Sequence, residues 1–159
     1  MRTPTLTYHW FAALLLGLLL LFAPSGTTSA AFEEPTKTVD GVAAYLGVMS
    51  AAIARGHPRQ HPEATMHGGP GSAGDRHIVV ALFDAKTFDR ITVAEITATV
   101  EGLAHIGRVT KKLERMDIAD AVTFGGYFPF QGTDNYTITL VINLADRRKA
   151  LTVTFRYQT

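Results

Sequence analysis

Cysteine is absent from the 159 residues of this chain, and the chemistry that cysteine supplies is therefore excluded. No disulfide can stabilise the fold, and no thiolate can act as a nucleophile or bind a metal. A soft metal ligand, if the protein has one, must be one of its four methionines.

A hydrophobic run long enough to be a confident membrane span is also lacking. The chain starts with MRTPTLTYHW, continues with FAALLLGLLLLFAP and then reaches the small-residue stretch SGTTSAA. The apolar run is shorter than the roughly 20 residues that span a bilayer. A basic start, a short apolar run and a small-residue exit are typical of a secretory signal peptide. We predict a signal peptide over residues 1–30, cleaved after Ala30 or Ala31, with an uncleaved anchor as the alternative.

The chain has no marked excess of charge of either sign. Arg2 is the only charged residue of the predicted signal peptide, so its removal leaves equal numbers of basic and acidic residues. Nucleic acids and anionic membrane surfaces require clustered, uncompensated Lys and Arg. We therefore expect no nucleic-acid partner, no integral membrane span after signal cleavage, and a periplasmic or secreted location in a bacterium. Residues 31–159 are long enough for one domain.

Short segments rich in β-branched and aromatic residues follow one another through this domain, with turn signals between them. They cover residues 42–49, 77–84, 91–101, 109–116, 121–128, 135–144 and 150–158. Polar and apolar residues alternate with period two in three of them, which is typical of half-buried strands. The sequence predicts an all-β fold, an immunoglobulin-like antiparallel β-sandwich of about seven strands. The alanine-rich stretch 42–54 also allows a helix.

The connection between the first two predicted strands, residues 55–77, is rich in His, Pro and Gly and contains four of the six histidines. His57 and His61 have the spacing of a helical metal pair, but each precedes a proline, which disfavours helix. Any metal site here is therefore a loop site. Imidazole suits copper, zinc, iron and nickel, and a thioether favours Cu(I), so copper fits this set best. The predicted ligands are His57, His61, Met66, His67 and His77; a solvated loop without metal is the alternative.

Other residues could be additional ligands or parts of the core. Glu63 could orient an imidazole by a hydrogen bond. Met49 and Met116, near the ends of their predicted strands, are expected to fill gaps in the core, although the same edge of the sandwich could hold both. The aromatic segment GGYFPF, residues 125–130, is expected to be buried rather than exposed.

Two catalytic patterns are present in outline only. Gly69, Gly71 and Gly74 match the spacing of a dinucleotide-binding loop, but a predicted strand follows where that motif requires a helix. Ser72 lacks the preceding glycine of a nucleophile elbow, because Pro70 occupies that position. We therefore predict that the protein is not an enzyme.

The segments HIVVALFDAKTFDRITVAEITATVE and GTDNYTITLVINL resemble the small bacterial periplasmic immunoglobulin-like proteins of the YtkA-like, FixH-like and CopC-like group. The second segment resembles the Gly-x-x-x-Tyr entry of that group into a late strand. The resemblance implies copper handling or the assembly of respiratory oxidases. The chain lacks the N-terminal histidine and the Met-rich segment of the copper-resistance relatives, which counts against a role in copper transfer.

Two functions follow from the sequence. The first is a periplasmic, non-enzymatic copper-binding protein with a His/Met loop site, whose partner could be a membrane or periplasmic metalloprotein. The second is a periplasmic protein-interaction module that serves a membrane complex without metal. Such a module would use an exposed sheet edge or the segment 125–130.

Overall fold

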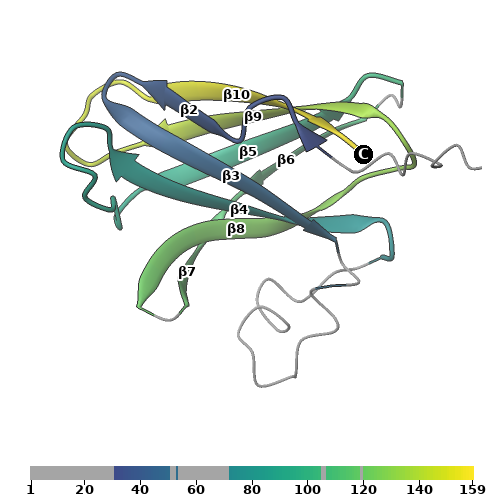
Figure 1. Ribbon diagram of the computed structural model, residues 1–159, viewed down its shortest axis with the longest axis horizontal. Helices are drawn as coiled ribbons and strands as arrows, with labels where there is room; N and C mark the ends of the chain where they lie inside the picture. The colour runs from purple at the N-terminus through teal and green to yellow at the C-terminus, as the bar shows by residue number, and fades with distance from the viewer. Residues whose placement is uncertain (1–30, 51–52, 54–71, 105–106, 119) are drawn as a thin grey trace, which may run out of the picture.

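The computed structural model describes residues 31–50, 53, 72–104, 107–118 and 120–159. These residues form two antiparallel sheets packed face to face, the immunoglobulin-like β-sandwich that the sequence predicts (Figure 1). One sheet has the order β1-β10-β9-β5-β6 and the other β2-β3-β4-β8-β7. The strands are β1 Ala31–Phe32, β2 Thr36–Val39, β3 Val42–Ser50, β4 Asp75–Asp84, β5 Glu95–Gly102, β6 Arg108–Lys112, β7 Glu114–Ile118, β8 Ala121–Pro129, β9 Asn135–Asn143 and β10 Leu151–Gln158.

The described residues form ten strands where the sequence predicts about seven, and the difference lies at the two sides of the sandwich. The predicted strand 109–116 is two strands, because the chain leaves one sheet after β6 and enters the other as β7. Only the buried Leu113 separates these two strands. β1 and β2 make the same change of sheet on the opposite side. The predicted first strand is β3, so the alternative of a helix over 42–54 is wrong for residues 42–50.

The core lies between the sheets and is built from every second residue of the central strands. In β4, Ile78, Val80 and Leu82 are fully buried against the opposite sheet. Because side chains alternate across a strand, His77 and Val79 must point to the outer face. The same alternation assigns an inner and an outer face to each neighbour of β4.

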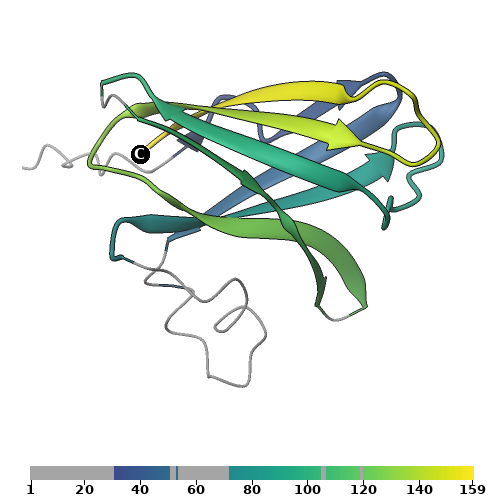
Figure 2. The same ribbon diagram turned by 180° about the vertical axis from the view of Figure 1, so that it is seen from behind.

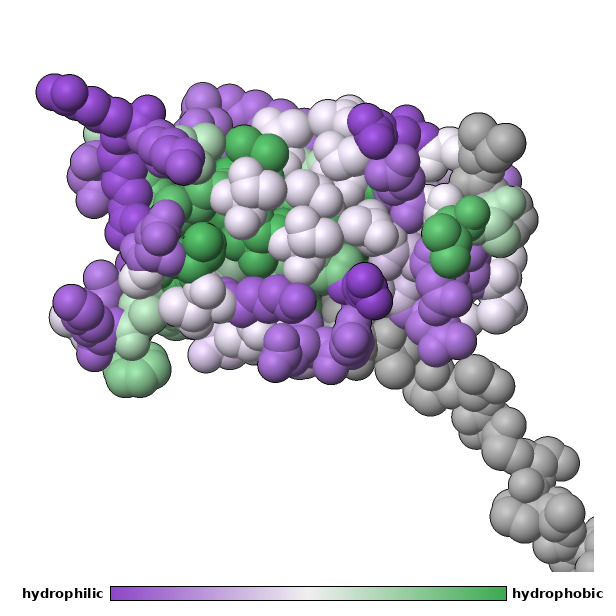
Figure 3. Space-filling view, turned by 90° about the horizontal axis from the view of Figure 1, so that it is seen from above, coloured by the Kyte–Doolittle hydropathy of each residue, from purple (hydrophilic) through white to green (hydrophobic). Residues whose placement is uncertain are grey.

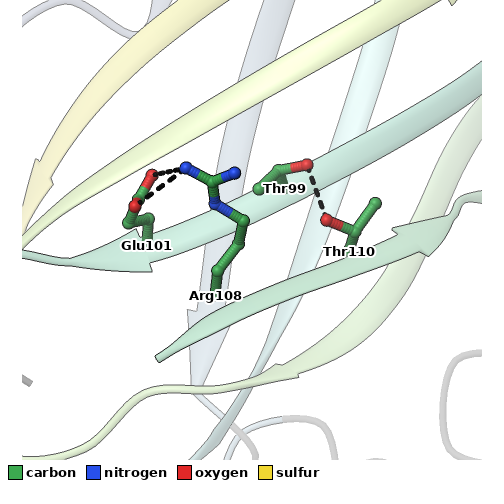
Figure 4. Close-up of polar contacts among 4 residues, drawn as sticks. All are labelled: Thr99, Glu101, Arg108 and Thr110. Carbon is green, nitrogen blue, oxygen red and sulfur yellow. Dashed lines mark hydrogen bonds and ion pairs between the residues drawn. The ribbon is translucent and has the colours of Figure 1, made fainter. Parts of the chain in front are cut away.

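The outer face of the β10-β9-β5-β6 sheet, turned toward the viewer in Figure 2, is polar. On β5 and β6 the Thr99 and Thr110 hydroxyls lie 2.9 Å apart, and Arg108 pairs with Glu101 at 3.1 Å (Figure 4). Such cross-strand pairs are ordinary features of a solvated sheet face. Because these pairs are exposed, they do not indicate a buried binding site on this face.

The side of the sandwich at which β2 and β10 meet is mixed in character. Seen from above the view of Figure 1, it shows hydrophobic residues among weakly polar ones, with hydrophilic residues around them (Figure 3). β2 and β10 belong to different sheets and contact each other there. No helix within the part of the chain that the structure describes is long and apolar enough to cross a membrane.

Tyr136 fixes the connection between β8 and β9. Its phenol oxygen accepts a hydrogen bond from the Gln131 backbone N–H at 2.7 Å and donates one to the Gln131 carbonyl at 2.8 Å. The side chain is almost fully buried and its ring packs on that of Phe130. Tyr136 is the tyrosine of the Gly-x-x-x-Tyr entry singled out in the sequence, and its role is to hold the chain as it enters β9.

Candidate functional site

Of the five predicted metal ligands, the structure describes one. His57, His61, Met66 and His67 lie outside the described residues, as do Glu63 and the predicted signal peptide, residues 1–30. His77 is described and is the third residue of β4. The site is therefore built from His77 outward.

His77 is fully buried, although it lies on the outer face of its sheet. Its ring stacks on that of Tyr127, the residue opposite it in β8, with the ring centroids 4.7 Å apart and the planes inclined by 26°. A strand position of this kind is normally half-exposed, because an outer sheet face meets solvent. A buried imidazole held by a stacked ring marks this part of the face as different from its surroundings.

Met116 and Gly125 complete the surroundings of His77 on the β7 side. A Cβ atom placed on Gly125 would lie 2.6 Å from the Met116 methyl carbon and 2.8 Å from His77 Nε2. Both atoms are therefore close to one point, and only the absence of a side chain at position 125 leaves room for them. The methyl carbon of the Met116 thioether, from β7, and an imidazole nitrogen of His77, from β4, thus lie together above Gly125 of β8.

Met49 lies on the other side of His77. The two residues are paired in the β3–β4 register, and Met49 is half-buried on the same outer face. Tyr127, His77 and Met49 thus form one row across β8, β4 and β3. Met116 is fully buried, as expected of a gap-filling residue, whereas Met49 is only half-buried, and neither belongs to the core cluster between the sheets.

The described residues on either side of the segment 51–71 lie near the start of β4. Ser50 is the last residue of β3 and is paired with Arg76, directly before His77. The Ser72 hydroxyl donates a hydrogen bond to Asp75 at 2.7 Å, where β4 begins.

The ligand types in this cluster decide which metal it could hold. Among the described residues, no group of three His, Cys, Asp or Glu side chains could hold a metal ion. The cluster offers one imidazole and two thioethers, a soft set that suits Cu(I) better than Zn²⁺ or Mg²⁺. The residues present therefore fit copper, and the fit depends on the two methionines.

The sequence identifies His77 as a ligand and names Met49, Met116 and the segment 125–130, but it does not indicate that these residues surround His77. The signal for Gly125 was present, since glycine inside a strand often marks a close approach of other groups. Tyr127, Phe128 and Phe130 were expected to be buried, and each is at most 5% exposed. That burial removes the exposed aromatic patch from the interaction-module hypothesis.

Solved structures share the fold. A DUF4426 family protein from Pseudomonas aeruginosa matches with a TM-score of 0.60 at 13% identity, over 79% of this chain and 96% of that one. A copper-bound variant of FetP from uropathogenic Escherichia coli gives 0.61 at 12%, over 82% and 97%. Copper-reconstituted P19 from Campylobacter jejuni gives 0.60 at 11%, over 82% and 96%. No family model matches the chain, and no curated protein matches its sequence. The likeness shows a common β-sandwich fold.

Proposed function

We propose that this chain is an exported, non-enzymatic copper-binding protein whose metal site includes His77 and Met116 on the outer face of the β2-β3-β4-β8-β7 sheet. The observation that carries the proposal is the convergence of His77 Nε2 and the Met116 methyl carbon on one point above Gly125. Imidazole together with a thioether is a ligand pair that favours copper.

Two further observations support copper. Two solved structures with the same fold, FetP and P19, hold copper, although their sequence identity to this chain is low. FetP has also been produced in the periplasm of E. coli, which agrees with the signal-peptide layout of residues 1–30. The loop histidines His57, His61 and His67 remain part of the proposal, since the described residues on either side of their segment, Ser50 and Ser72, lie near the start of β4.

Copper titration of the purified protein tests the proposal. A His77→Phe variant keeps a flat ring to stack on Tyr127 and removes both donor nitrogens, so we expect copper affinity to fall by more than about tenfold. A second variant, with His57, His61 and His67 changed to Ala, measures the contribution of the loop. Binding that stabilises the folded state should raise the unfolding free energy by about 2.7 kcal/mol at a hundredfold excess over the dissociation constant.

Circular dichroism of both variants is the control for folding. If the wild-type protein shows neither copper binding nor copper-dependent stabilisation, copper binding is excluded. If only the loop variant loses affinity, the site belongs to His57, His61 and His67 and not to β4. If His77→Phe alone loses affinity while its fold is intact, the strand site is established.

The alternative is a metal-free interaction module that uses a sheet edge. The edge strands β6 and β7 carry charged side chains, including Lys112 and Glu114, which are typical of edges protected against strand addition. Capture of a partner by the apo protein, unaffected by chelator, would favour this second function.

A further inference from the structure

We propose that Met49 is a third copper ligand, which completes with His77 and Met116 a set of one imidazole and two thioethers that holds Cu(I). This inference rests on the proposed function and specifies the oxidation state of the ion at the same site. It differs from the sequence-based assignment, in which the soft ligand is Met66.

The strand register places Met49 beside His77. β3 and β4 are antiparallel, and Met49 is directly opposite His77. The Cβ atoms of directly opposed residues lie about 4.5–5.5 Å apart. Leu46, on the same strand, is buried in the core, so the alternation of β3 sends Met49 to the outer face. His77 therefore has a methionine on either side, one from β3 and one from β7.

The row next to these residues leaves space for the two thioethers to turn toward the imidazole. It consists of Gly47, Val79 and Gly125, which are paired across β3, β4 and β8. A Cβ atom on Gly47 would meet nothing closer than the Val79 carbonyl oxygen at 3.9 Å. Two of the three positions therefore lack side chains. Because methionine has three rotatable bonds and a polarisable sulfur, Met49 and Met116 can adapt to an ion held between them.

The charge of the ion also favours Cu(I). Methionine sulfur and a neutral imidazole carry no charge, so this set does not neutralise a bound cation. Taking an ion into a buried environment without neutralising ligands is costly, and the cost rises steeply with its charge. A monovalent soft ion is therefore preferred to Cu²⁺ or Zn²⁺. Met49 is half-buried whereas His77 and Met116 are buried, so Met49 is the ligand on the solvent side, through which the ion enters.

The test compares Met49→Leu with Met66→Leu, a matched substitution at the methionine of the His-rich connection. Leucine keeps the volume of methionine and removes the sulfur, so both variants are expected to fold. Competition titration with a colorimetric Cu(I) chelator should show a loss of affinity of at least about tenfold for Met49→Leu and no change for Met66→Leu. X-ray absorption of the Cu(I)-loaded protein should show two sulfur neighbours in the wild type and one in Met49→Leu.

The outcomes separate this inference from the proposed function. Wild-type Cu(I) affinity and an unchanged sulfur count in Met49→Leu would overturn the role of Met49 and leave copper binding by His77 and Met116 in place. Loss of affinity in Met66→Leu alone would assign the second thioether to residue 66 and would also overturn the role of Met49. Absence of copper binding by the wild type would contradict both this inference and the proposed function. If Met49→Leu fails to fold, the wild-type protein and Met66→Leu still test the inference, since fewer than two sulfur neighbours in either of them contradicts it.

Discussion

Gly125→Ala is expected to destabilise the fold and to abolish copper binding at His77. The added Cβ would lie 2.6 Å from the Met116 methyl carbon, 2.8 Å from His77 Nε2 and 2.9 Å from the Ile78 carbonyl oxygen. The methionine can move aside, but the carbonyl belongs to the backbone of β4 and the imidazole is stacked on Tyr127. Overpacking of this kind costs about 1–3 kcal/mol. Chemical denaturation gives the loss of stability, and copper titration gives the loss of affinity.

Gly47→Ala is the matched control. Gly47 and Gly125 are both opposite Val79, in β3 and β8, and both belong to the outer face. A Cβ on Gly47 is 3.9 Å from its nearest neighbour, so the substitution should change stability by less than about 0.5 kcal/mol. Equal losses of stability in the two variants would show that glycine is needed in both strands for a reason other than the contacts of position 125 with Met116 and His77. Full copper affinity in Gly125→Ala would contradict the placement of the site above β8.

Most strands could be predicted because one face of each packs against the core and the other does not, which gives an alternating pattern of apolar and polar residues. In 135–144 and 150–158 the period-two alternation of apolar and polar residues corresponds closely to the buried and exposed positions of β9 and β10. The change of sheet at Leu113 could not be read in this way. β6 and β7 are edge strands with largely exposed residues. Neither has a continuous apolar face that would indicate to which sheet it belongs.

The site was predictable only in part. His77 was selected because it ends a His-rich segment, and the structure places it in a buried cluster. Met49 and Met116 are distant in the sequence and have no motif that links them. The β3–β4 register places Met49 opposite His77, and the glycine at position 125 leaves room for Met116 near His77 Nε2; strand register over such distances depends on the complete sheet.

Tyr136→Phe is expected to lower the unfolding free energy by about 1–3 kcal/mol, because the Gln131 N–H and carbonyl both lose their phenol partner. Tyr45→Phe is the control: Tyr45 is 44% exposed, so removal of its hydroxyl should change the unfolding free energy very little. Denaturant unfolding at neutral pH measures both variants. A loss of unfolding free energy in Tyr45→Phe equal to that in Tyr136→Phe would contradict the role of the Tyr136 hydroxyl in holding the β8–β9 connection.

The Tyr136→Phe variant also gives a pH dependence with a defined sign. Burial raises the pKa of the Tyr136 phenol above its ordinary value of 10.0, and the nearby Asp134 charge acts in the same direction. Below that value the phenol is neutral in both the folded and the unfolded chain, so the hydroxyl contributes its full stabilisation. As the pH rises further, the unfolded chain loses the phenol proton first. The stabilisation therefore decreases as the pH rises from the pKa of the unfolded state to the higher pKa of the folded state. The stability difference between wild type and Tyr136→Phe should therefore shrink above about pH 10. A Tyr136→Phe difference that grows with pH would contradict the raised pKa.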